Sequence, residues 1–471
     1  MKRLYVFLSL ALFLTLFAAC SPQPGDNGGE SAPDIPTLDP DRTGDGGTDD
    51  ASITRVPTAG GWLDGSPADV GPGAVFESSS EEGEAVAADS MSAGADEDGV
   101  ALAEPPPVER PEVDSESTDD RAANQNSQLN AGEVDDNANW DDYLLFLREY
   151  AGASVIEMDV SERHQIQVVD QDGRPVLGAV IDIEAHGQRV ARLRSHSDGL
   201  AYFFPRTLPE SDQAQSYSVR VQSGDQTQEM TLESAGAQRE WQVVMPLDQA
   251  REAGVNLDIL FLIDTTGSMG DEIAQLKENI QAISAQIDAM PGQPNVRFGM
   301  TVYRDQGDSY LSRTFDFTPD VEEFAAGLAD VEAGGGGDYP EDLNEGLSRA
   351  IHAPEWRVEE TISLIFLVAD APPHLDYFQE NHYGVEIVVA NERGIKIFPI
   401  ASSGLDGQGE YIFRQLAQFT GGKFIFLTYG ESGPGSTGTE TTHNVDDYTV
   451  SALDDLVVKI VEEELTNQEF Q

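Results

Sequence analysis

The chain has 471 residues, of which 85 are acidic and 27 are basic, and its formal net charge is −58. This length exceeds the roughly 100 to 200 residues of an ordinary domain, so at least two domains are expected. The charge argues against nucleic acid and against an anionic membrane surface as partners, because phosphate groups would be repelled at long range. Cations and basic proteins suit such a chain better.

An export signal is predicted over residues 1–19. A positively charged start, MKR, precedes an apolar stretch that is too short to span a bilayer comfortably and ends in two small residues before Cys20. Cys20 is the only cysteine, so no intrachain disulfide can form. The run LFAAC resembles a bacterial lipobox. The resemblance implies lipidation of Cys20, with palmitate-type acyl chains, and anchoring in the bacterial envelope at the outer membrane or cell surface. The alternative is an ordinary signal peptide cut nearby.

The segment from residue 20 to residue 130 is predicted to be a disordered acidic tether. It is rich in Pro, Gly, Ser, Asp and Glu and carries few aromatic residues. Such a composition cannot bury enough apolar surface to offset its chain entropy. Like charges and prolines favour extension of the tether.

A short amphipathic helix is predicted within residues 131–158. The run NWDDYLLFLREY places Trp140, Tyr143, Leu144, Leu147 and Tyr150 at helical spacing behind an acidic start. We expect this helix to pack on the domain that follows it and to carry no chemistry.

A small all-β sandwich is predicted over residues 160–248. From residue 165 apolar and polar residues alternate between turn signals, which is typical of short antiparallel strands. The segment resembles the carboxypeptidase regulatory-like, or transthyretin-like, modules of bacterial surface proteins, which implies a spacer or protein-binding role without a catalytic site. The resemblance is carried by Val169, Asp170, Gly173, Pro175, Val176, Gly178, Ala179, Val180, Ser195, Asp198, Gly199 and Phe203.

A doubly wound α/β domain with a mostly parallel, Rossmann-like sheet is predicted over residues 254–467. Continuous apolar runs, typical of strands buried on both faces, alternate with amphipathic helical segments. The runs cover residues 257–263, 297–302, 362–369, 395–400 and 423–427, and the helices cover 271–289, 341–351, 384–393, 410–419 and 450–465. Ligands of such sheets bind at the carboxyl ends of strands, where Asp264 and Asp370 lie.

The sequence DTTGSM begins directly after the first apolar run of this domain. It places one carboxylate and two hydroxyls, those of Asp264, Thr266 and Ser268, at alternate positions of a turn. Hard oxygen ligands at this spacing suit Mg²⁺, which prefers octahedral oxygen coordination and retains several waters. The alternative is that these side chains only cap the following helix.

This arrangement resembles the metal-ion-dependent adhesion site (MIDAS) of von Willebrand factor A (VWA) domains, whose signature is Asp-x-Ser/Thr-x-Ser. The resemblance covers residues 254–467 and includes SLIFLVAD, which ends at Asp370, and the loop AGGGGDYPED. It implies a divalent cation, Mg²⁺ first with Ca²⁺ and Mn²⁺ as alternatives. The implied metal ligands are Asp264, Thr266, Ser268, Asp338 and Asp370, where Asp338 stands in place of the Thr that is usual in the family.

A further segment, VYRDQGD over residues 302–308, resembles a segment of the bacterial and alpha-kinase-associated branch of that family. For Tyr303, Arg304, Asp305 and Asp308 we favour a buried ion pair or a loop brace. His374 is interpreted as a loop residue.

Three functions are open at this stage. The leading hypothesis is a binding protein involved in cell adhesion, in which an acidic side chain of a protein partner completes the coordination of the cation. The second is a structural envelope scaffold that a cation stabilises. The third is a metal-assisted hydrolase built on Asp264, Asp338 and Asp370, for which only His374 or Glu341 is at hand as a base. No nucleophile elbow, paired-His motif or P-loop is visible in the sequence, so no enzyme is expected.

Overall fold

The computed structural model describes residues 130–468, apart from 209–210, 212–213, 235–237, 248–253, 291–293, 431–432, 438, 446–447 and 449. The predicted export signal, Cys20 and the predicted tether up to residue 129 lie outside the described residues. Among the helices that are described, none combines the length and the apolar character needed to cross a membrane.

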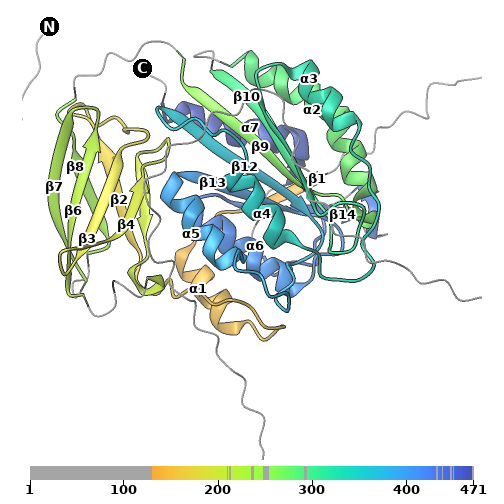
Figure 1. Cartoon of the computed structure of the whole chain (residues 1–471), viewed down its shortest axis with the longest axis horizontal. Helices are drawn as coiled ribbons and strands as arrows, with labels where there is room; N and C mark the ends of the chain where they lie inside the picture. The colour runs from red at the N-terminus through yellow and green to blue at the C-terminus, as the bar shows by residue number, and fades with distance from the viewer. Residues whose placement is uncertain are drawn as a thin grey trace, which may run out of the picture. The chain divides into compact units, whose positions relative to one another are not determined.

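The larger part of the described chain is built around a nine-stranded sheet (Figure 1). Its strand order is β11-β10-β9-β12-β13-β14-β1-β16, with β15 paired to β14. The five central strands run parallel: β10 (Asn295–Tyr303), β9 (Asn256–Asp264), β12 (Thr361–Ala369), β13 (Ile395–Ala401) and β14 (Phe424–Gly430). The prediction of a mixed α/β fold with a mostly parallel sheet is confirmed.

The central strands form where the sequence is largely apolar, because helices cover both faces of the sheet. Every residue of β12 is buried. Along β9 successive side chains alternate between two cores: Phe261 and Ile263 belong to one cluster of buried residues, whereas Leu260 and Leu262 belong to the other.

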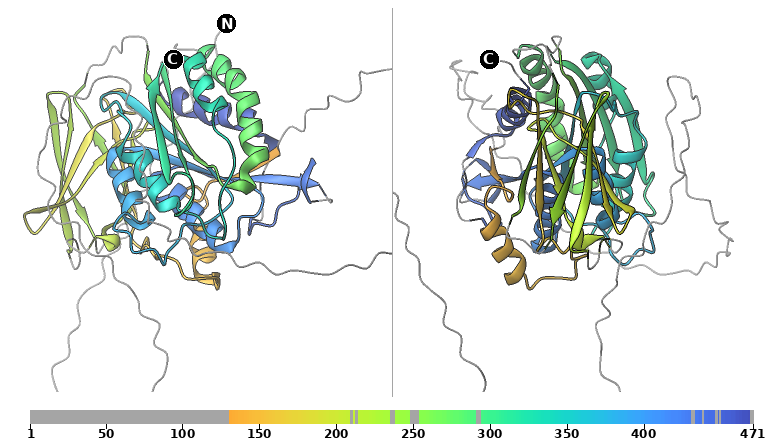
Figure 2. Two further views of the ribbon diagram at one scale, coloured as in Figure 1. Left: turned by 45° about the vertical axis from the view of Figure 1, so that its right-hand side comes forward. Right: turned by 90° about the vertical axis from the view of Figure 1, so that its left-hand side faces the viewer.

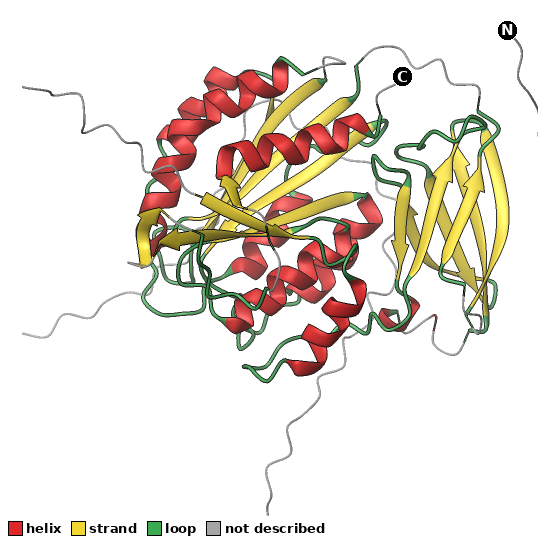
Figure 3. Cartoon of the chain, turned by 180° about the vertical axis from the view of Figure 1, so that it is seen from behind, coloured by secondary structure: helices red, strands yellow, loops and turns green. Residues whose placement is uncertain are grey.

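Helices cover the two faces of the sheet (Figures 2 and 3). The first core holds side chains of α2 (Gly270–Asp288), α3 (Val321–Ala329) and α7 (Leu453–Thr466). The second holds side chains of α1 (Trp140–Glu149), α4 (Leu343–His352), α5 (Tyr383–Arg393) and α6 (Gly407–Thr420). The doubly wound architecture therefore places the carboxyl ends of the parallel strands between two helical layers.

The edges of the sheet differ from the prediction. Antiparallel strands that were not predicted flank the parallel core: β11 (Ser312–Thr318) pairs with β10, and β1 (Asn130–Val134) lies between β14 and β16 (Val450–Ala452). β15 (Gly433–Thr437) extends from β14, and α3 follows β11. The segment predicted as helical over residues 131–158 therefore begins with a strand of the large sheet.

The predicted helix around residues 140–150 forms as α1, but its packing corrects the expectation. The ring of Phe146 lies against that of Tyr411 on α6, with centroids 6.0 Å apart. Just before α1, Asp136 accepts two hydrogen bonds from Arg414, at 3.0 and 2.5 Å, and both side chains are buried. Helix α1 thus docks on α6, which belongs to the C-terminal part of the chain.

Residues 164–244 contain two smaller sheets. One has the order β5-β2-β8 and the other β4-β3-β6-β7. The strands are β2 (His164–Val169), β3 (Val180–Ala185), β4 (Gln188–Arg194), β5 (Leu200–Phe203), β6 (Ser216–Ser223), β7 (Gln226–Glu233) and β8 (Glu240–Val244). Buried residues of both sheets form one cluster. Pairing is antiparallel except between β2 and β8, which run parallel. The resemblance of this part to carboxypeptidase regulatory-like modules stays a prediction.

Candidate functional site

The candidate site lies at the carboxyl end of β9, in the middle of the sheet. From β9 the chain continues to β10 on one side, and β12 lies on the other side. Tyr303, the last residue of β10, pairs with Asp264, and Val368 of β12 pairs with Ile263. Loops that leave neighbouring strands in opposite directions open a crevice at such a switch point, where α/β proteins bind ligands.

Asp264 ends β9 with a carboxylate that is fully buried. Its Oδ1 accepts hydrogen bonds from the backbone N–H of Thr266, at 2.9 Å, and from the Thr266 hydroxyl, at 2.8 Å. Its Oδ2 makes no hydrogen bond of regular geometry, and the neighbouring Tyr303 hydroxyl acts to lower its pKa. Burial, together with the negative charge of Asp370, raises the pKa of Asp264 to about 7. A buried carboxylate oxygen without a partner is costly, so it calls for a positively charged neighbour.

The next residues turn back over the end of the strand and supply two hydroxyls. A single 3₁₀ turn, Gly267–Met269, leads directly into α2, with Thr266 buried before it and Ser268 exposed within it. Ser268 donates a hydrogen bond to Asp370, the residue that follows β12. Burial raises the pKa of Asp370, and this hydrogen bond opposes the rise. Four of the five predicted site residues therefore lie together, namely Asp264, Thr266, Ser268 and Asp370.

A glycine loop holds a second segment of chain against this turn. The N–H of Gly334 donates to the carbonyl of Thr265, and the N–H of Gly267 donates to that of Gly335. Gly336 has a φ of +65°, in the left-handed region. A Cβ on Gly336 would lie 2.6 Å from Glu341 Oε1 and 3.0 Å from the Cβ of Thr266. Glycine is required here because the backbone passes closely between the turn and the Glu341 carboxylate.

Glu341 is a site residue that the sequence interpretation did not include among the metal ligands. It is buried, its Oε2 has no hydrogen-bond partner, and its pKa is raised to about 8. The cause is burial first and then the negative charges of Asp264, Asp305, Asp308 and Asp370. The only signal in the sequence was its place after the glycine run, in GGGGDYPE.

The donor set fits a hard divalent cation. Two buried carboxylates with unpartnered oxygens, on Asp264 and Glu341, raise the pKa values of neighbouring groups and share their surroundings with Asp370. Oxygen ligands of this kind, together with hydroxyls, are those that Mg²⁺ and Ca²⁺ take in proteins. Burial is the main cause of the raised pKa values of Asp264 and Glu341, and repulsion between carboxylates adds to it. A cation would offset both effects.

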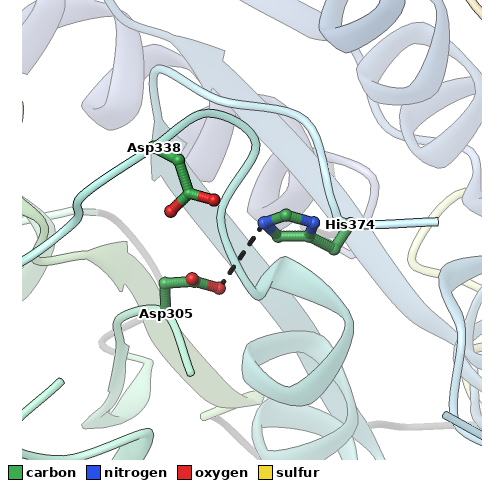
Figure 4. A group of neighbouring side chains, drawn as sticks. All are labelled: Asp305, Asp338 and His374. Carbon is green, nitrogen blue, oxygen red and sulfur yellow. Dashed lines mark ion pairs between the residues drawn. The ribbon is translucent and has the colours of Figure 1, made fainter. Parts of the chain in front are cut away.

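The fifth predicted ligand, Asp338, belongs to a different group of side chains. It is exposed, and its carboxylate lies with Asp305 and His374, such that one potential ligand atom from each residue lies within 4.8 Å of the others (Figure 4). Among the described residues this is the one set of three or more His or acidic side chains that meets this limit.

Residues of the 302–308 segment brace the glycine loop, as the favoured interpretation expected for them. Asp308 Oδ2 accepts a hydrogen bond of 2.8 Å from the N–H of Gly336. Arg304 Nη2 donates one of 2.7 Å to the carbonyl of Glu332. Asp305 also matches that interpretation, because its Oδ1 lies at ion-pair distance, 3.7 Å, from His374 Nε2 and both side chains are buried (Figure 4). Asp338 joins the same group.

Comparison with known proteins identifies the α/β part. Residues 258–429 match the family model of the von Willebrand factor A domain, so the chain contains a VWA domain. It is similar to alpha-protein kinase vwkA of Dictyostelium discoideum, with 33% identity over 127 residues, which are 27% of this chain and 20% of the relative. It is also similar to von Willebrand factor A domain-containing protein 7 of Rattus norvegicus, with 36% identity over 114 residues, 24% of this chain and 12% of the relative.

Two further matches complete the comparison. A putative ariadne-like RING finger protein, R811, of Acanthamoeba polyphaga mimivirus is 26% identical over 188 residues, 36% of this chain and 18% of the relative. A solved structure of the conserved hypothetical protein BatB from Bacteroides thetaiotaomicron matches with 16% identity and a TM-score of 0.28, covering 45% of this chain and 98% of that one. The matched part spans a fifth or less of each of the three sequence relatives.

Proposed function

We propose that this protein is a bacterial envelope lipoprotein whose VWA domain binds a divalent cation in a MIDAS-type site and, through that cation, an acidic side chain of a protein partner. VWA domains generally mediate interactions between proteins, which supports the coarser part of this proposal. The observation that carries the finer part is the fully buried Asp264 carboxylate with an unpartnered Oδ2, beside Asp370 and the hydroxyls of Thr266 and Ser268.

In this proposal Asp264, Thr266, Ser268 and Asp370 hold the cation, and Glu341 takes part as a further carboxylate. Mg²⁺ is the preferred ion because hydroxyl, carboxylate and water oxygens suit its octahedral coordination, with Ca²⁺ and Mn²⁺ as alternatives. The cation supplies a positive charge that a partner's carboxylate can bind. The hydrogen bonds between Thr266 and Asp264 hold these two ligand side chains in position. Ser268 is exposed at the solvent side of the site.

The proposal is tested with displayed peptides. Two peptide libraries are panned on the full chain, one with Asp or Glu at a fixed central position and one with Asn or Gln there. We expect enrichment from the acidic library only, only when Mg²⁺ is present, and not on Thr266→Ala. Equal enrichment from both libraries, or enrichment that survives chelation, would contradict cation-mediated recognition of a carboxylate.

The scaffold alternative predicts a different pattern. If the cation only ties the domain together, the parent itself will enrich no acidic peptides in a cation-dependent way, and substitution of Thr266 and Ser268 by Ala will lower the thermal stability measured with Mg²⁺. If the site is a binding site, the same variants keep the fold, as judged by circular dichroism, and lose the acidic peptides. No catalytic activity is proposed for the site.

Anchoring through Cys20 is part of the same proposal, and it rests on the leader sequence alone. Acyl chains contribute about 0.8 kcal/mol per buried methylene, so several chains on one cysteine hold a protein at a bilayer without a spanning helix. The acidic segment after Cys20 would then act as a tether, and the two small sheets, which follow it in the sequence, as a spacer or a protein-binding module.

A further inference from the structure

A second group of potential metal ligands is formed by three loops near the candidate site. Asp305 follows β10, Asp338 lies in the loop between α3 and α4, and His374 lies in the loop after β12. Their side chains point toward one another (Figure 4), with one ligand atom of each within 4.8 Å of the others. His374 Nε2 and Asp305 Oδ1 are 3.7 Å apart, which is too long for a hydrogen bond.

His374 brings a buried nitrogen that no hydrogen bond satisfies. Its side chain is 6% exposed, and Nε2 has no hydrogen-bond partner. Nδ1 lies 2.7 Å from Asp376 Oδ1, and the tautomer with its proton on Nδ1 donates to that carboxylate. The lone pair of Nε2 then faces Asp305 and Asp338. While Nε2 carries no proton, its lone pair and the two carboxylates repel one another unless a cation lies between them.

The surrounding contacts hold these ligands in position. The ring of His374 stacks on that of Tyr377, with centroids 3.9 Å apart and an interplanar angle of 9°. The hydroxyl of Tyr377 donates to Asp305, at 3.0 and 2.9 Å from its two carboxylate oxygens. Asn344 Nδ2 donates to the carbonyl of His374. Metal-binding histidines usually donate their second ring N–H to a carboxylate, as His374 does to Asp376, and metal-binding carboxylates are usually hydrogen-bonded, as Asp305 is by Tyr377.

From this geometry we infer that Asp305, Asp338 and His374 form a second metal site, distinct from the one at Asp264, that takes a divalent transition-metal ion such as Zn²⁺ or Mn²⁺. The imidazole nitrogen favours Zn²⁺ over Mg²⁺ and Ca²⁺, whose ligands are oxygens, and the two carboxylates also suit Mn²⁺. Three protein ligands leave at least one coordination position free, and the exposed Asp338 places the site at the solvent boundary.

The two sites are neighbours joined by one short segment. The N–H of His374 donates to the carbonyl of Glu341, and the N–H of Glu341 donates to the carbonyl of Pro372. Glu341 also experiences the charges of both Asp264 and Asp305. An ion at the second site therefore fixes the segment from Asp338 to Glu341 that reaches the first site. The inference does not rest on the proposed function, because its ligands are separate residues.

The inference is tested by metal analysis of the full chain. Metal-free protein is dialysed against a low but constant concentration of free Zn²⁺ with a large excess of Mg²⁺, which occupies oxygen-only sites and the acidic surface. Bound zinc is counted by mass spectrometry. We expect one Zn²⁺ per chain in the parent and in Asp264→Asn, and binding weakened about tenfold or more in His374→Gln and Asp338→Asn. Asp338 is exposed, so its variant tests the site without disturbing the core.

The matched control is His352→Gln. His352 Nε2 lies 2.9 Å from Glu386 Oε2, outside the three-residue group, so this variant should bind zinc as the parent does. With Mn²⁺, electron spin-echo spectra should show coupling to an imidazole nitrogen that His374→Gln removes. Zinc binding that is absent in the parent, that His374→Gln leaves intact, or that Asp264→Asn abolishes would overturn the inference. If the parent binds zinc as expected but Mg²⁺ does not raise its thermal stability, that result would count against the proposed function alone.

Discussion

Substitution of Asp264 by Asn should stabilise the protein when cations are removed and should abolish its response to Mg²⁺. The Asp264 carboxylate is buried, and its pKa is raised from 3.8 to about 7. The folded state therefore binds the proton more tightly than the unfolded state does. Protonation of Asp264 therefore contributes to the free energy of unfolding. This contribution is fully present below about pH 4 and is lost as the pH rises to about 7, because the folded chain must then bury a charged carboxylate.

The magnitude follows from the size of the shift. A rise of about three pKa units corresponds to roughly 4 kcal/mol, since each unit is worth about 1.36 kcal/mol. Asn keeps the acceptor for the N–H of Thr266 and removes the charge. In chelator at about pH 8, Asp264→Asn should therefore be more stable than the parent by up to about 4 kcal/mol, or roughly 8 to 16 °C in Tm for a domain of this size. At about pH 4 the difference should vanish.

The assay is thermal unfolding of the full chain in chelator and in Mg²⁺. Binding to the folded state raises the parent's stability by about 2.7 kcal/mol at a free cation concentration 100 times Kd, and the variant should show no such rise. Asp330→Asn, on an exposed side chain, is the control and should change stability by less than about 0.5 kcal/mol. If Asp264→Asn is less stable than the parent in chelator at about pH 8, the reasoning from an uncompensated buried charge is wrong.

Three further substitutions test other parts of the structure. Gly336→Ala should lower the free energy of unfolding by about 1 to 3 kcal/mol in urea titrations, because Gly336 has a positive φ and lies close to the Glu341 carboxylate. The control is Gly337→Ala, which should be nearly neutral because a Cβ there meets nothing within 4 Å. Arg414→Met should cost about 3 kcal/mol in the same assay, because it leaves the buried Asp136 carboxylate uncompensated, and an unchanged midpoint would contradict the docking of that segment. Replacing the sole cysteine by Ser should abolish incorporation of labelled palmitate in a bacterial host and release the protein from the membrane fraction, whereas retained label would reject the predicted anchor.

The parallel core could be predicted because its physical cause is local in the sequence. Strands buried on both faces must be largely apolar, and the runs ending at Asp264 and Asp370 are so, apart from Ser363 and from Asp258, which forms ion pairs with two arginines. The edge strand β11 escaped prediction because its sequence, SRTFDFT, is half-buried and carries charge. Strand β1, NAGEV, has no apolar pattern and finds its place through partners about 300 residues away, near Phe426 and Ser451. No local signal reports such pairing.

Part of the candidate site could likewise be predicted from the sequence, and part could not. Asp264, Thr266 and Ser268 lie in one turn, and Asp370 ends an obvious apolar run, so their convergence followed from the rule that ligands bind at strand ends. Glu341 was missed as a ligand candidate because its burial depends on the path of the glycine loop.

The second group of potential metal ligands could not be predicted from the sequence, for a related reason. Asp305, Asp338 and His374 lie in three loops, and each of them alone has an ordinary role in a loop. Only the folded arrangement brings them together, and it moves Asp338 from the first predicted ligand set into this one.

The central claim is that a divalent cation binds beside Asp264. Its most direct test is a crystal structure of the full chain grown with Mn²⁺, with anomalous difference density recorded at the manganese edge. The account predicts a manganese peak within bonding distance of the hydroxyls of Thr266 and Ser268, next to Asp264 and Asp370. Crystals that contain Mn²⁺ elsewhere but show no peak at that turn would contradict it.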